Sequence, residues 1–139
     1  MTETVFVDTA GWLALVNKSD SLHRKARKIR DRLLEQSIRF AVSDYVIVEI
    51  ANALSRAPWR ETAIRLISSI YASDDVIVVE VDKALLQEAW ELYRAREDKD
   101  WSLTDCTSFV IMNKGGMRRA FTSDNHFEQA GFSVLMKIR

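Results

Sequence analysis

Hydrophobic and polar positions along this chain follow two different periods. Short apolar runs predict five β-strands, at 4–8, 39–42, 76–79, 119–122 and 133–136. The run at 76–79 consists only of β-branched residues, which is typical of a strand covered on both faces. Between these runs the apolar residues recur every three or four positions, and this period predicts amphipathic helices.

The expected helix starts coincide with residues that cap helices. Ser43 and Asp82 each precede a helical stretch, and Ser102 or Thr104 begins another. For the second helix the N-cap candidates are the three consecutive residues at 19–21. The first expected helix follows the first strand directly and ends at 16, and the second contains the apolar stripe Leu22, Ala26, Ile29 and Leu33. Further helices are expected over 45–54, from about 60 to 72 and from 82 through 93. The last begins at 102 or 104 and ends at the glycines at 115–116.

Strands that alternate with helices predict an α/β fold with right-handed crossovers. We expect a three-layer α/β/α sandwich around a mainly parallel central sheet. The chain has one proline and four glycines and contains no linker, repeat or low-complexity tract. The whole chain, 1–139, is therefore expected to form a single domain.

Composition excludes several classes of protein. With 47% hydrophobic and 29% charged residues, the 139-residue chain is neither disordered nor a membrane protein. No apolar run approaches the roughly 18 residues that span a bilayer, and the first residues lack the layout of a secretion signal. We therefore expect a cytoplasmic protein. The single cysteine, Cys106, agrees with a reducing compartment and is expected to be a small buried residue.

Charge is balanced overall but uneven along the chain. Twenty basic and twenty acidic residues cancel, so net charge makes no case for nucleic acid. Residues 24–32, however, carry six cations and one anion. The simplest interpretation is a solvated helix face. Beside an acidic metal centre, the same face would hold phosphates through Arg24, Lys25, Arg27 and Lys28.

Four acidic residues stand at positions that can converge in such a fold. Asp8 and Asp124 follow apolar runs, at the carboxyl ends of expected strands, where open α/β sheets bind ligands. Glu49 and Asp105 lie inside apolar helical stretches that contain no Lys or Arg. Since a buried carboxylate needs a partner, a divalent cation is the economical choice.

The chemistry of this acidic set favours hard cations. Mg²⁺ and Mn²⁺ prefer carboxylate and water oxygens. Zinc is a poor candidate, because His23 and His126 are remote in sequence and neither belongs to a paired motif. Without metal, mutual repulsion should raise at least one carboxyl pKa so that the group holds a proton near neutrality. With metal, a bound water can hydrolyse a phosphodiester.

A structural alternative stays open for part of the set. Asp105 and Asp124 each stand where an acidic side chain commonly caps a helix. With 20 acidic residues in the chain, a quartet of this kind can also arise by chance.

Four segments together resemble PIN-domain nucleases, and most closely the VapC toxins of type II toxin-antitoxin pairs. The matching segments are Val7-Asp8-Thr9, the stretch from Ser43 to Glu49, the stretch from Leu103 to Ser108, and Thr122-Ser123-Asp124-Asn125-His126-Phe127. They occur in the family's order over nearly the whole chain. One departure is Cys106, where the family more commonly has alanine.

The resemblance implies a Mg²⁺- or Mn²⁺-dependent endoribonuclease that is a homodimer and is inhibited by a small cognate VapB-like antitoxin. Asp8, Glu49, Asp105 and Asp124 would be the catalytic, metal-binding acids. Supporting roles would fall to the hydroxyls of Thr9 and Thr122 and to Asn125, and His126 would have a structural role. Exposed apolar residues such as Trp59 and Trp90 could contribute to a dimer interface.

Three alternatives belong to other functional classes. A non-catalytic module that binds RNA or antitoxin could keep the fold, but it would not need all four acids. A PIN nuclease could instead act in RNA processing or on DNA. A phosphoaspartyl enzyme does not fit, because Ala10 occupies the place of the second aspartate in an Asp-x-Asp motif and no paired acid precedes Asp8.

Overall fold

Five parallel strands form the central sheet of the protein. The computed structural model describes residues 3–137. The strands are arranged in the order β3-β2-β1-β4-β5, and every neighbouring pair is parallel. Their bounds are Thr4–Val7 (β1), Arg39–Ser43 (β2), Val76–Val79 (β3), Arg119–Phe121 (β4) and Ser133–Val134 (β5). The predicted α/β fold with a parallel sheet is therefore confirmed.

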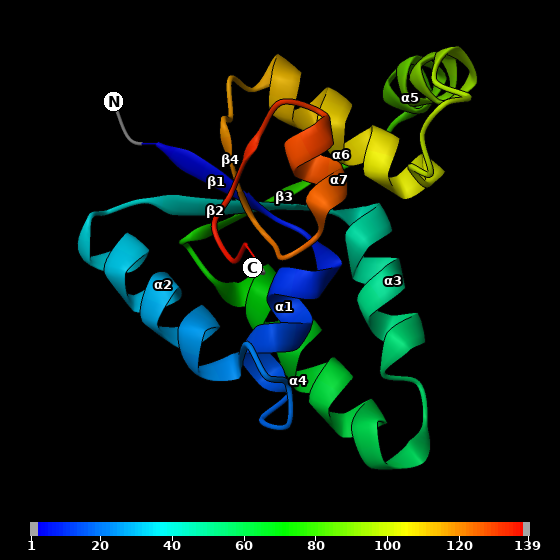
Figure 1. The fold of residues 1–139 in the computed structure, drawn as a ribbon. Helices are drawn as coiled ribbons and strands as arrows, with labels where there is room; N and C mark the ends of the chain where they lie inside the picture. The colour runs from blue at the N-terminus through cyan, green and yellow to red at the C-terminus, as the bar shows by residue number, and fades with distance from the viewer. Residues whose placement is uncertain (1–2, 138–139) are drawn as a thin grey trace.

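Helices cover both faces of this sheet. Figure 1 shows α1, α2 and α4 on one side of the strands and α5, α6 and α7 on the other, with α3 extending from the end of β2. The bounds are Thr9–Val16 (α1), His23–Glu35 (α2), Asp44–Ala53 (α3), Ala57–Ala72 (α4), Lys83–Ala95 (α5), Leu103–Lys114 (α6) and Asn125–Gln129 (α7). No helix within residues 3–137 is long and apolar enough to cross a membrane.

The core is aromatic on both sides of the sheet. On one side the rings of Phe40 and Phe121 meet edge to face, with centroids 6.3 Å apart. On the other, Phe127 lies 6.4 Å from Phe6 and 5.0 Å from Phe109. Successive strand residues point to opposite faces, so the central strands β1 and β4 are buried on both.

Gly11 allows α1 to lie directly against β4. A Cβ atom at this position would be 2.1 Å from the backbone oxygen of Phe121. Any side chain here would push the start of α1 away from the sheet, and with it the neighbouring Asp8.

We expect Gly11→Ala to lower the free energy of unfolding by about 1–3 kcal/mol, because an overpacked backbone contact has to relax. Thermal or denaturant unfolding measures the loss. Gly115→Ala is the matched control, since its Cβ would meet the flexible end of Met117 at 2.9 Å, where the side chain can move away. Equal stability of Gly11→Ala and the native chain would contradict the close packing described above.

The start of α2 differs from the prediction. The helix begins at His23 with Leu22 as its N-cap, and the expected N-cap candidates at 19–21 lie before it. The Asp20 carboxylate accepts a hydrogen bond from the backbone nitrogen of Leu22 at 2.8 Å. Asp20 therefore closes a turn ahead of the helix, a role that short polar side chains often take.

The expectation of a fully covered β3 is wrong. β3 pairs only with β2 and forms one edge of the sheet, and Ile77 keeps 37% of its surface exposed. Strand order is a tertiary property, and a β-branched run does not reveal whether it lies at the centre or at the edge.

Smaller differences concern the ends of elements. α4 begins at Ala57 and carries Pro58 in its first turn, where the missing N–H costs nothing. β5 ends at Val134, although the backbone nitrogens of Leu135 and Met136 still donate to Ala120 and Thr122. The short helix α7 was not among the expected helices, although Asp124 was considered as a helix cap.

Candidate metal centre

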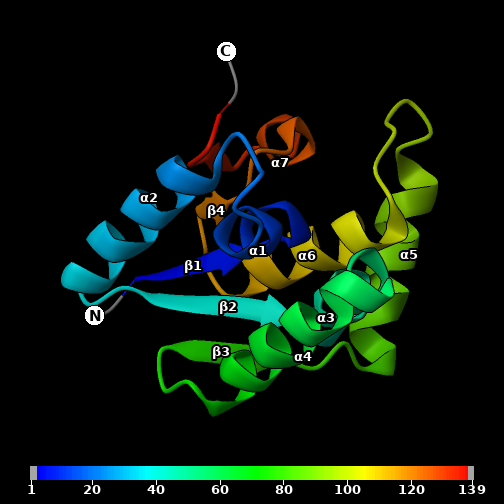
Figure 2. The same cartoon turned by 90° about the horizontal axis from the view of Figure 1, so that it is seen from below.

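Two acidic residues meet at the carboxyl ends of β1 and β4. Val7 is paired with Phe121 in the sheet, so the residues that follow these strands lie side by side. The Thr122 hydroxyl connects the two acids. It donates to Asp8 Oδ2 at 3.4 Å and accepts from the backbone nitrogen of Asp124 at 3.0 Å. As expected for a parallel sheet, the ends of β1 and β2 point toward the side where α3 and α6 begin (Figure 2).

Helix α6 brings Asp105 to the same edge. Its backbone nitrogen donates to Ser102 Oγ at 2.9 Å, and its Oδ2 accepts from the backbone nitrogen of Ser102 at 3.1 Å. This reciprocal capping box fixes the carboxylate at the start of the helix. Only 8% of the Asp105 surface is exposed.

Glu49 approaches from α3. Its Oε1 accepts a hydrogen bond from the Thr9 hydroxyl at 2.5 Å, and Thr9 is the residue after Asp8. The side chain is half-buried. A residue 40 positions further along the chain is thus tied to the start of α1.

Asp8 is the most deeply buried of the four acids, with 5% of its surface exposed. Burial raises the Asp8 pKa from its ordinary value of 3.8 to about 7, a hydrogen bond from the Thr9 backbone opposes this rise, and the charges of Asp105, Glu49 and Asp124 add to it. The sequence-based expectation of one carboxyl with a pKa raised toward neutrality therefore matches Asp8, although burial and not repulsion is the largest cause.

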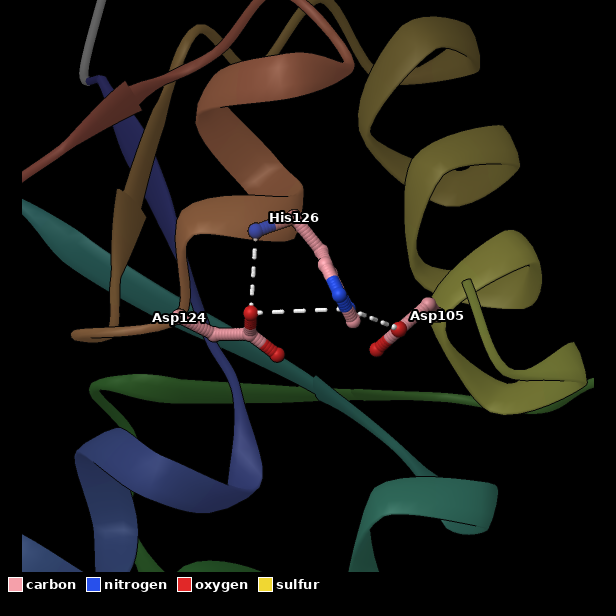
Figure 3. Close-up of side chains that lie close together, drawn as sticks. All are labelled: Asp105, Asp124 and His126. Atoms are coloured by element: carbon pink, nitrogen blue, oxygen red, sulfur yellow. Dashed lines mark hydrogen bonds and ion pairs between the residues drawn. The ribbon is translucent and has the colours of Figure 1, made fainter. Parts of the chain in front are cut away.

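His126 joins this cluster, which the sequence did not predict. Its Nδ1 lies 3.0 Å from Asp105 Oδ2 and 3.5 Å from Asp124 Oδ1, and the ring stands between the two carboxylates (Figure 3). Ligand atoms of these three residues all lie within 4.8 Å of one another. Only a structural role was expected for His126 from the sequence, and its place beside Asp105 results from the packing of α7 against α6.

A signal for this position was present in the sequence. Asp124 caps α7 and accepts from the backbone nitrogen of His126 at 2.9 Å. An Asp-x-His arrangement at a helix start therefore places both side chains at the same end of that helix.

The proposed need for a cation partner is met in part by the protein itself. Asp105 has Ser102 and His126 as partners, and Glu49 has Thr9. Both Asp105 and Asp124 also cap helices, so the structural alternative raised from the sequence describes real contacts. Capping uses only part of the lone-pair capacity of a carboxylate, and oxygens remain for a ligand.

Asn125 is placed differently from its predicted supporting role, whereas Cys106 lies as expected. Asn125 begins α7 with an exposed side chain that makes no hydrogen bond to any residue in the range 3–137. Cys106 is buried as expected, and burial raises its thiol pKa to about 11, which leaves it protonated at neutral pH.

The cationic surface of α2 is exposed and little neutralised. We use this name for Arg24, Lys25, Arg27 and Lys28, none of which forms an ion pair with an acid in the described part of the chain. Lys25 Nζ donates to the backbone oxygen of Lys137 at 3.4 Å. Lys137 in turn pairs with Glu128 on α7 at 3.0 Å, so the start of α2 is connected to the helix that carries His126.

The donor set fits a hard divalent cation. The ligand atoms that lie within 4.8 Å of one another belong to Asp105, Asp124 and His126. Asp8 and Glu49 stand outside this group of three, and they accept hydrogen bonds from the hydroxyls of Thr122 and Thr9. Carboxylate-rich sites of this kind suit Mg²⁺ and Mn²⁺.

Comparison with known proteins identifies the family. The PIN domain model matches residues 5–133. The chain belongs to the PIN domain family. It is 31% identical over 128 residues to the 23S rRNA-specific endonuclease VapC20 of Mycobacterium tuberculosis. The matched region covers 92% of this chain and 95% of VapC20. The predicted membership of the VapC-type group is thereby confirmed.

Solved structures agree with this assignment. The crystal structure of M. tuberculosis VapC20, a sarcin-ricin loop cleaving toxin, has a TM-score of 0.81 at 32% identity and covers 92% of this chain and 95% of its own. VapBC2 from Rickettsia felis, solved with a promoter DNA fragment, has a TM-score of 0.68 at 12% identity, covering 94% of this chain and 96% of that chain. At that identity the likeness concerns the fold alone.

Proposed function

We propose that this PIN-domain protein is a Mg²⁺- or Mn²⁺-dependent endoribonuclease and the toxin of a VapBC-type toxin-antitoxin pair. The observation that carries the proposal is the close grouping of Asp105, Asp124 and His126, near enough to Asp8 that the charges of Asp105, Asp124 and Glu49 help to raise its pKa. Similarity to a 23S rRNA endonuclease over nearly the whole chain supports it.

Asp8, Asp105 and Asp124 would hold the cation, and Glu49 would be the fourth acidic residue of the site. When bound, the cation supplies an activated water and neutralises charge on the phosphate. Thr122 orients Asp8 through its hydroxyl, and Thr9 orients Glu49. Burial of Asp8 excludes bulk water from one side of the site, which strengthens electrostatic interactions with the reacting phosphate. Asn125, the third predicted supporting residue, has an exposed side chain.

The cationic surface of α2 is proposed to hold RNA phosphates. Charge reversal at Arg24, Lys25, Arg27 and Lys28 should weaken RNA binding and flatten its salt dependence, since each lost phosphate contact reduces the slope of log K against log salt by about 0.9 or less. Filter binding or fluorescence anisotropy at several salt concentrations measures both effects.

Charge reversal at Arg60 and Lys83 provides a control, because these exposed cations lie on other helices. Unchanged binding and slope after reversal on α2 would show that this face is ordinary solvated surface.

We further propose a VapB-like antitoxin as partner, action in the cytoplasm, and a homodimer. Membership of the VapC-type group supports the antitoxin. Half-exposed Trp59 and Trp90, at 38% and 44%, offer apolar surface for a dimer contact. Light scattering of the purified protein distinguishes a 16.0 kDa monomer from a particle of twice that mass.

RNA cleavage is the direct test of the proposed activity. Purified protein with Mg²⁺ or Mn²⁺ should cleave ribosomal RNA at defined positions, and EDTA should stop the reaction. A non-catalytic binding module would retain RNA without cutting it, and a DNA-directed nuclease would cut single-stranded DNA of the same sequence at least as fast. Either result would replace the proposal with that alternative.

A further inference from the structure

The imidazole of His126 has no role in the mechanism outlined above, although it lies inside the site. Its Nδ1 is 3.0 Å from Asp105 Oδ2 and 3.5 Å from Asp124 Oδ1. The side chain is 26% exposed, so it is neither deeply buried in the core nor free in solvent. Figure 3 shows the ring wedged between the two carboxylates.

The spacing of these three ligand atoms is compatible with a shared cation. Neighbouring ligands of an octahedral ion with bonds of about 2.1 Å lie about 3 Å apart. The two nitrogen–oxygen distances are close to this value, and all three atoms lie within 4.8 Å of one another. One ion could therefore contact both carboxylates and the ring without a large rearrangement.

Resting on the proposed metal-dependent function, we propose that His126 is a protein ligand of the cation, and that its nitrogen makes this centre prefer Mn²⁺ over Mg²⁺. Mg²⁺ binds oxygen ligands and gives up its water reluctantly, whereas first-row transition ions accept imidazole nitrogen more readily. A carboxylate-only centre would discriminate less between the two ions.

A different role for His126 would give a different signature. As a positioning residue, the ring would donate its Nδ1–H to Asp105 and orient that carboxylate. As a ligand, Nδ1 must be free of its proton, and the ring binds as the neutral tautomer protonated at Nε2. Loss of a positioning contact weakens the binding of both ions by the same factor, whereas loss of a nitrogen ligand weakens the binding of Mn²⁺ more than that of Mg²⁺.

Pulsed electron paramagnetic resonance of the untagged protein loaded with Mn²⁺ tests the ligand directly. The chain has only two histidines, His23 and His126. His23 Nδ1 lies 2.8 Å from the backbone oxygen of Ala14, away from the acidic cluster. We expect an imidazole nitrogen modulation of the Mn²⁺ signal in the native protein and in His23→Asn, and none in His126→Asn.

Titration calorimetry supplies a second readout that does not depend on activity. His126→Asn should weaken Mn²⁺ binding about tenfold and leave Mg²⁺ binding nearly unchanged. His126→Gln, with its longer amide, should behave in the same way, and circular dichroism checks that both variants fold.

Mn²⁺ binding and RNA cleavage without nitrogen modulation would overturn the role of His126 and leave the proposed function intact. An equal loss of affinity for Mn²⁺ and Mg²⁺ in His126→Asn would also overturn it and would show that His126 positions Asp105. Failure of the native protein to bind Mn²⁺ or Mg²⁺ at all would overturn both proposals.

Discussion

An Asp8→Asn variant is expected to lose metal-dependent RNA cleavage by a factor of about 10³ or more while keeping its fold. Asn is nearly isosteric with Asp and can still accept the hydrogen bond from Thr122. It lacks the negative charge that a divalent cation needs at the centre of the acidic set. Cleavage of a labelled RNA in Mg²⁺, followed under single-turnover conditions, measures the loss.

Glu61→Gln is a suitable control for this experiment. Glu61 is an exposed acid on α4 whose one ion pair with the described residues is to Arg65, so removing its charge should leave the cleavage rate unchanged. If Asp8→Asn cleaved RNA as fast as Glu61→Gln, Asp8 would have no part in the reaction.

Stability of the metal-free protein should decrease as the pH rises from about 4 to about 7. In this range folded Asp8 keeps a proton that it has lost in the unfolded chain, since burial first and then the neighbouring acids raise its pKa from 3.8 to about 7. Folding is therefore favoured at the acidic end of the range and loses this contribution as the carboxyl ionises. A shift of this size corresponds to at most about 4 kcal/mol.

Denaturant unfolding in EDTA at pH 5 and pH 8 measures this effect, and Asp8→Asn is the reference. The variant has no carboxyl at position 8, so its stability should change less between the two pH values than that of the native protein. Added Mn²⁺ should stabilise the native protein most at pH 8, where the acids are ionised. If the native protein and Asp8→Asn showed the same pH dependence, the raised pKa of Asp8 would not contribute to folding stability.

The acidic residues at strand ends could be predicted because each directly follows, in the sequence, the apolar run that forms the strand. The apolar run before Asp8 predicts a strand. The alternation of strands and helices predicts a parallel sheet, in which ligands bind at the carboxyl ends of the strands. The same reasoning reached Asp124 through the run at 119–122. Glu49 and Asp105 stood out because a charge interrupts an apolar helix.

Contacts between elements that are distant in sequence could not be predicted. Thr122 reaches Asp8 only because β4 lies next to β1, and local patterns do not determine strand order. For the same reason β3 was expected to be covered on both faces, although it lies at an edge and Ile77 stays partly exposed. His126 reaches Asp105 because α7 packs against α6, and no periodicity in either segment indicates this contact.

Helix capping and metal binding are not exclusive alternatives here. Ser102 and Asp105 form a capping box, and Asp124 caps α7. Each cap fixes the orientation of a carboxylate by hydrogen bonds to the backbone, and this rigidity is what a preorganised metal site requires. Sequence patterns for the two roles overlap, because both place an acid at the start of a helix.

Anomalous diffraction from a crystal grown with Mn²⁺ tests the central claim most directly. We predict a manganese peak at the end of β1 and β4, within bonding distance of carboxylate oxygens from Asp8, Asp105 or Asp124. A crystal saturated with Mn²⁺ that shows no peak among these side chains, or only peaks elsewhere on the surface, would contradict the account.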